Sequence, residues 1–139
     1  MPITIDGLDE AHAKVALDIL TADGGSWTVY KGSVGPLPTK PYVLVYTVVE
    51  WPGVGISNAL DGRSGTCVTR WYTHSVGESD QGTRAVANRV RQLLVNVRPT
   101  IAGRSCGFIQ QETALPFQRD ETTGALIQDL TAVYILTTT

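Results

Sequence analysis

One motif in the sequence is typical of a catalytic nucleophile. Residues 103–107 read Gly-Arg-Ser-Cys-Gly and match G-x-S-x-G, in which α/β hydrolases place a serine on a tight turn between a strand and a helix. The hydrolase pattern requires an acidic residue and then a histidine later in the chain. Both histidines, His12 and His74, precede Ser105, and a strand rather than a helix is expected after it. The motif therefore does not predict a hydrolase.

Ligands for a metal or a cofactor are sparse. Neither histidine has a cysteine or carboxylate at ligand spacing on its own element. Cys67 and Cys106 form no CxxC pair and are expected to be small buried residues. Asp120 and Glu121 are adjacent in a predicted loop, so they do not form the facing pair that acid-base catalysis needs. We predict no catalytic residue, no metal site and no cofactor, and hence a protein that is not an enzyme.

Glycines near the middle of the chain could suggest nucleotide binding. The segment GVGISN, which starts at Gly53, has two glycines after a predicted strand. It lacks the third glycine of a dinucleotide fingerprint and the G-K-[ST] ending of a phosphate loop. Nucleotide binding is therefore not indicated.

Length and charge limit the classes of protein. A chain of 139 residues is enough for one domain, expected over 1–139. The net charge of -2 and the pI of 5.6 argue against a protein that follows a phosphate backbone. No apolar run reaches the roughly 18 residues that cross a bilayer, and the N-terminus has no secretion signal, so we expect no membrane partner and a cytosolic location in the producing cell.

The surface composition favours contacts between proteins. Charged residues make up 17% of the chain, compared with about 25% in average soluble domains. Eight of the eleven basic residues are arginines, the cation that is enriched in interfaces. We expect part of the surface to be covered by neighbouring subunits.

Periodicity predicts two helices and five strands. Apolar residues at helical spacing indicate helices over 8–20 and from 79 or 80 to about 97, the second closed by Pro99. Strands are expected over 26–32, 41–50, 65–76, 104–113 and 129–137. The 41–50 strand is almost continuously apolar, which is typical of a strand inside a sheet with both faces covered. The predicted class is α+β, with two helices on one face of a mixed, mostly antiparallel sheet in the order α-β-β-β-α-β-β.

Three segments are candidate contact surfaces. The loop over 51–65 carries Trp51, Val54 and Ile56, although Trp51 could instead fold back on the core. A second long loop covers 115–124. The outer side of the second helix carries arginines, which form either a solvated face or a face for a partner subunit. These candidate interface residues are Trp51, Val54, Ile56, Arg63, Arg84, Arg89, Arg91, Gln118, Arg119 and Asp120.

The succession of motifs resembles the tail terminator proteins of long-tailed bacteriophages (siphoviruses), especially those that infect actinobacteria. The resemblance lies in WTVYKGSV, PYVLVY, TCVTRWYTHSVGES, QGTRAVANRVRQLL, RPTIAGR and FQRDE, followed by a last strand with Asp129 and Tyr134. It spans nearly the whole chain.

The resemblance implies a structural virion protein. Tail terminators form a ring, expected to be a homohexamer, that caps the head-proximal end of the tail tube, ends its polymerisation and joins the neck proteins. By the same resemblance, the loops over 51–65 and 115–124 contact partners along the tail axis, and Arg84, Arg89 and Arg91 lie at the subunit boundary. The implied partners are further copies of the chain, the major tail tube protein and a head completion protein. Genome DNA would pass through the ring without sequence-specific contacts.

Two other classes stay open at this point. Another head-tail connector or neck completion protein would have the same size, composition and lack of catalytic residues. A small-ligand-binding α+β domain would need a concave pocket with converging polar groups.

Overall fold

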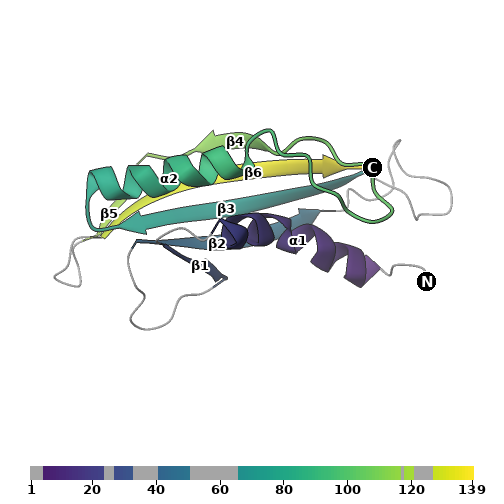
Figure 1. Cartoon of the computed structure of the whole chain (residues 1–139), viewed down its shortest axis with the longest axis horizontal. Coiled ribbons are helices and arrows are strands. Elements are labelled where there is room, and N and C mark those ends of the chain that lie inside the picture. Colours follow the sequence, from purple (N-terminus) through teal and green to yellow (C-terminus); the bar gives the residue numbers. More distant parts are fainter. Residues whose placement is uncertain (1–4, 24–26, 33–40, 51–65, 117, 121–126) are drawn as a thin grey trace.

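The computed structural model describes residues 5–23, 27–32, 41–50, 66–116, 118–120 and 127–139, and everything below refers to these. For 5, 6, 8, 118–120 and 127 it describes the backbone alone. Two helices lie against one sheet (Figure 1). The elements are α1 (Ile5–Ala22), β1 (Thr28–Lys31), β2 (Tyr42–Glu50), β3 (Cys67–Gly77), α2 (Asp80–Leu94), β4 (Gln110–Ala114), β5 (Gln118–Asp120) and β6 (Ile127–Thr138).

The sheet is mixed and mostly antiparallel, as predicted. Its strand order is β1-β2-β3-β6-β4. The short β5 also pairs with β6, along a part of that strand that β4 does not reach. Only the β1–β2 pair is parallel. The long β3–β6 ladder runs from Cys67 opposite Thr138 to Gly77 opposite Gln128 and forms the centre of the sheet. The predicted α+β class and the element order are confirmed, and β5 is an additional strand of three residues.

One face of the sheet holds the core. Alternate residues of β3 are buried, so Trp71 and its neighbours on that side point toward the helices, as the alternation predicts. The indole Nε1 of Trp71 donates to the Ala13 carbonyl of α1 at 3.1 Å. Both helices pack on this face, with α1 over β1 and β2 and α2 along β3 and β6 (Figure 1). The core residues shared by these layers are Ala16, Leu20, Val43, Val45, Trp71, Val86, Val90, Leu94, Ile109, Tyr134 and Leu136.

Local signals set the ends of α2. Ser79 is the N-cap, and its hydroxyl accepts from the Gly82 amide at 3.0 Å. The helix ends at Leu94, earlier than the predicted end near 97, because Val95 has an extended ψ of 134° and Asn96 a φ of 66°, neither of which an α-helix allows. Val97 therefore lies outside the helix, although it still packs against the core. Helix α1 is longer than predicted at both ends.

The segment between α2 and the last strand differs from its prediction. A continuous strand over 104–113 is wrong, because only Gln110–Ala114 pairs as β4. Before it, the Ile109 amide donates to the Val97 carbonyl at 2.8 Å, so this stretch bonds to the exit of α2. Cys106 makes an isolated bridge with Thr138. Both cysteines are buried thiols, as predicted.

Candidate functional site

The most exposed apolar surface on the sheet is in the second half of β2. The continuous apolar run of this strand predicts cover on both faces, and this is wrong for Tyr46 and Val48, which are 43% and 41% exposed. Both helices lie on the other side of the sheet. The face without helices is called the open face here. Its opposite end is closed, since Tyr42 and Val76 are buried there.

The register extends this surface over three strands. Tyr46 lies opposite Tyr72 of β3, and Val48 lies opposite Arg70. Arg70 is in turn opposite Ile135 of β6. The half-buried side chains of Tyr72 and Ile135 continue the apolar surface. The open-face patch is defined as Tyr46, Val48, Tyr72 and Ile135.

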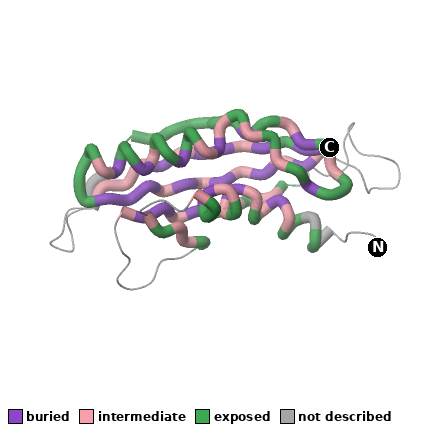
Figure 2. The backbone as a smooth tube through the Cα atoms, in the orientation of Figure 1, coloured by how far each residue is buried: buried purple, intermediate pink, exposed green. Residues whose placement is uncertain are grey.

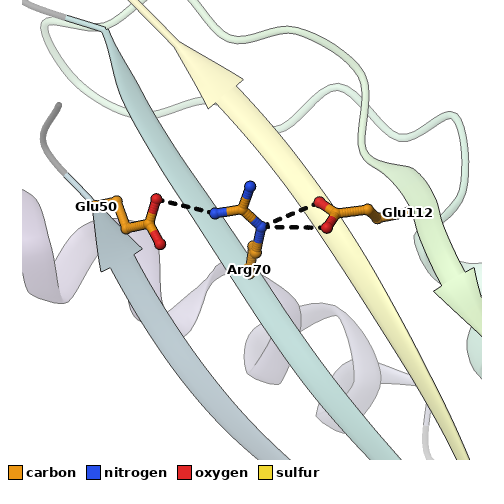
Figure 3. Close-up of polar contacts among 3 residues, drawn as sticks. All are labelled: Glu50, Arg70 and Glu112. Atoms are coloured by element: carbon orange, nitrogen blue, oxygen red, sulfur yellow. Dashed lines mark hydrogen bonds and ion pairs between the residues drawn. The ribbon is translucent and has the colours of Figure 1, made fainter.

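A cluster of three charged residues lies across the open-face patch, because Arg70 stands between Val48 and Ile135 in the strand register. Arg70 lies between two glutamates of different strands, Glu50 of β2 and Glu112 of β4 (Figure 3). Its Nη1 is 2.9 Å from Glu50 Oε2, and its Nε is 3.0 Å from Glu112 Oε2. The register shift between Gln111 and Thr113 is a bulge at Glu112, which lets this side chain reach across β6.

The cluster has an acidic balance. The hydrogen bonds that Arg70 donates to Glu112 and then to Glu50 raise the pKa of Arg70, so its guanidinium stays charged. Two carboxylates and one guanidinium leave one formal negative charge. The Glu50 and Glu112 side chains are 53% and 40% exposed, so both carboxylates are partly accessible to a partner.

The pair of His74 and Asp129 lies at one end of the patch. His74 Nδ1 is 2.9 Å from Asp129 Oδ2 and 3.1 Å from the Thr131 hydroxyl. The hydrogen bond with Asp129 raises the pKa of His74, although burial opposes this. The Tyr46 ring packs edge-on against the imidazole, with 5.7 Å between ring centroids. An apolar centre with polar borders is the usual anatomy of a protein interface.

The outer side of α2 is the second exposed surface with a clear character. It is exposed along the helix, whereas β3 beneath it is largely buried (Figure 2). Arg84 Nε pairs with Asp80 at 2.9 Å, and Arg89 pairs with Asp23 near the end of α1. These contacts hold two of the predicted interface arginines within their own subunit. In the described ranges no carboxylate pairs with Arg91.

The end of α2 is hollowed next to Arg91. A shallow open depression of about 280 Å³ is lined by Arg91, Gln92, Val95 and Asn96. It is not the enclosed apolar cavity with convergent polar groups that small ligands use. A guanidinium at the rim of a depression is instead suited to receive a carboxylate side chain from another protein.

The remaining predicted interface residues are placed only in part. Trp51, Val54, Ile56 and Arg63 lie outside the described residues. Gln118, Arg119 and Asp120 form β5, paired with Asp129, Gln128 and Ile127, so this part of the predicted loop is a strand. The strand ends on either side of 51–65 lie at the end of the sheet where β3 pairs with Thr138, whereas β5 lies at the opposite end.

The described residues contain no arrangement for the chemistry weighed from the sequence. Ser105 is in the connection before β4, where its amide and carbonyl pair with Thr139, so the strand-to-helix turn of a nucleophile elbow does not occur. Among the described residues no three His, Cys, Asp or Glu side chains are grouped to hold a metal. No described helix is both long and apolar enough to cross a membrane.

The cluster of Glu50, Arg70 and Glu112 could not be predicted from the sequence as a unit. Arg70 and His74 alternate with the buried residues of β3, so the sequence of this strand contains a signal for them. The Arg70 partners Glu50 and Glu112 could not be found in the same way, because the strand order and the bulge in β4 bring them to Arg70. Exposure of Tyr46 and Val48 was hidden by a hydrophobic run that is also typical of a buried strand.

Comparison with known proteins identifies a structural neighbour. No protein-family model matches the chain, and no curated protein sequence matches it. Among solved structures, a chain of the "Virion of native gene transfer agent (GTA) particle" is similar with a TM-score of 0.56 and 13% sequence identity. The match covers 89% of this chain and 84% of the other. At this identity the likeness shows a shared fold.

Proposed function

We propose that the protein is a structural component of a phage-like virion, and that it acts as a tail terminator. Copies form a ring on the head-proximal end of the tail tube, end its polymerisation and provide the joint to the neck proteins. The observation that carries this proposal is the shared fold, over 89% of the chain, with a component of a gene transfer agent virion. The resemblance of the sequence motifs to tail terminators supplies the finer assignment.

The surfaces of the described residues support a role in assembly. The open-face patch leaves Tyr46 and Val48 exposed, which favours a protein partner over solvent. The arginines of α2 form a different surface on the other side of the sheet. A ring requires two unlike faces on each subunit, because identical contacts repeated by rotation join one face to another. A subunit with these two surfaces meets that requirement.

The proposal includes partners and a location. The ring is a homohexamer in the neck region of the virion, assembled in the host cytoplasm, and it contacts the major tail tube protein on one side and a head completion protein on the other. Genome DNA passes through the ring without sequence-specific binding. The protein has no enzymatic activity and needs no cofactor.

Binding to tube ends is the direct test. The purified protein is mixed with tubes grown from the tail tube protein of the same particle, and gold-labelled protein is located by electron microscopy. We expect label at one end of each tube and no further growth when fresh tube protein is added. Label along the tube walls, or continued growth from labelled ends, would contradict the proposal.

A neck completion protein is the competing assignment, because the similar structure is described only as a virion and not by position. The same experiment separates the two. A neck protein would leave free tube ends unlabelled and would bind only after a terminator ring had been added.

A further inference from the structure

We infer that the open-face patch of one copy is the docking surface for the outer side of α2 of a second copy. This inference deepens the proposed function, on which it rests for the existence of a ring, and it names the two surfaces that meet in each subunit contact. It needs no residue outside the described ranges.

The open-face patch leaves apolar side chains in contact with water, which costs free energy. Tyr46 and Val48 are neighbours on the same face of β2 and are the two large apolar residues of the sheet strands that are strongly exposed among the described residues. Tyr72 and Ile135 extend them across β3 and β6. Exposed apolar side chains on three neighbouring strands, with charged and polar groups among and beside them, are stabilised by a protein partner.

The open face and the outer side of α2 carry opposite charges. The Glu50, Arg70 and Glu112 cluster carries one formal negative charge across the patch, with both carboxylates partly exposed. On α2, Arg84 and Arg89 have carboxylate partners in their own subunit, and Arg91 has none among the described residues. The two surfaces are therefore complementary, and Arg91 is the cation available to the glutamates of the neighbour.

A two-fold contact between two open faces is unfavourable. Such a contact would bring two acidic clusters together and leave both copies of Arg91 unused. A contact between the open face and α2 pairs opposite charges instead. It also places arginines over the exposed Tyr46 ring, an arrangement that cation–π attraction favours.

The positions of the two surfaces on the subunit allow copies to join in a series. The open face and α2 lie on opposite sides of the sheet, so one contact leaves an unused copy of each surface at the two ends of the pair. Further copies then add in the same orientation, and they form the proposed ring when the rotation between copies closes. The depression beside Arg91, about 280 Å³, is where the glutamates of the neighbour are received.

Two variants that each disable one surface test the inference. Val48→Arg puts a cation into the open-face patch, and Arg91→Glu reverses the charge on α2. Sedimentation velocity measures self-association over a range of concentrations up to about 1 mM, where even a weak contact is populated. Each variant alone should associate at least about tenfold more weakly than the wild type.

Mixing the two variants is the decisive arm. The intact open face of Arg91→Glu can meet the intact α2 of Val48→Arg, so an equimolar mixture should regain association that neither variant shows alone. The matched control is Lys14→Glu, which reverses an exposed charge on α1 and should associate like the wild type. Circular dichroism and Tm confirm folding, and Tyr46→Ser replaces Val48→Arg if that variant unfolds.

Three results would overturn the inference: a wild-type protein that stays monomeric at about 1 mM, single variants that associate like the wild type, or a mixture that stays monomeric. Failure here is separable from failure of the proposed function. A protein that caps tubes but ignores both substitutions forms its ring through other surfaces. A protein that associates as inferred but does not bind tube ends is not a terminator.

Discussion

The close approach of Gly77 to α2 gives the sharpest prediction about the fold. Gly77 is the last residue of β3, and a Cβ placed on it would lie 2.6 Å from the Thr83 hydroxyl oxygen. Thr83 is fully buried, and its hydroxyl donates to the Ser79 carbonyl at 2.7 Å. The side chain therefore cannot move aside without losing that hydrogen bond. We predict that Gly77→Ala destabilises the protein by about 2 kcal/mol, the usual cost of overpacking.

A double-mutant cycle isolates the cause. Thr83→Ala loses one hydrogen bond, worth about 1 kcal/mol, and one buried methyl, worth about 0.8 kcal/mol. In that background the hydroxyl that blocks a Cβ at Gly77 is gone, and the nearest atom left is the Thr83 amide nitrogen at 3.3 Å. Gly77→Ala should then be close to neutral, because alanine also lowers the entropy of the unfolded chain by about 0.4–1 kcal/mol. The double variant should be about as stable as Thr83→Ala alone.

Urea unfolding followed by circular dichroism measures the four stabilities. The expected coupling between the two sites is about 2 kcal/mol, well above the roughly 0.5 kcal/mol scatter of independent sites. Additive effects within that scatter would refute the reasoning, because they would mean that Thr83 does not restrict the space beside Gly77.

Three further predictions concern single side chains. Trp71→Phe should lower the free energy of unfolding by about 2 kcal/mol, because it removes the bond to Ala13 and leaves a cavity under α1; urea titration measures it, and a neutral result would contradict the packing of α1 on the sheet. Ser79→Ala should cost about 1 kcal/mol through loss of the N-cap, while Ser79→Asp should retain most of it. His74→Gln should make stability less dependent on pH. The Asp129 hydrogen bond raises the pKa of His74 above 6.5, so the pair stabilises the fold fully below pH 6.5 and loses this contribution as pH rises through the raised pKa. Equal pH slopes for wild type and variant would argue against the pair.

Much of the fold could be predicted from periodicity. The alternation in β3 correctly separates the buried side of Trp71 from the side of Arg70, and the apolar stripe of α2 correctly places Val86, Val90 and Leu94 in the core. Local patterns are informative here because each face of an element meets one environment. Helix and strand ends were less predictable, since α2 ends where Val95 has extended backbone and Asn96 a positive φ, and neither residue type fixes these angles.

The candidate surface could be predicted only in part. Sequence patterns identified the α2 arginines as candidate interface residues, and the structure places them on the outer side of the helix. Sequence patterns could not show that Asp23 pairs with Arg89, because this contact joins distant parts of the chain. The acidic cluster also depends on pairing between distant strands. An apolar strand can be buried within its own subunit or covered by a partner protein. Which of the two occurs depends on the surrounding structure, and the sequence of the strand itself does not show it.

Tail length in particles made without the protein tests the central claim most directly. Electron micrographs of lysates from a producing strain that lacks the protein give the distribution of tube lengths, with complementation by the wild-type protein as the control. The proposed terminator role predicts overlong tubes of variable length, restored to one length by complementation. Tubes of normal, uniform length in the absence of the protein would contradict it.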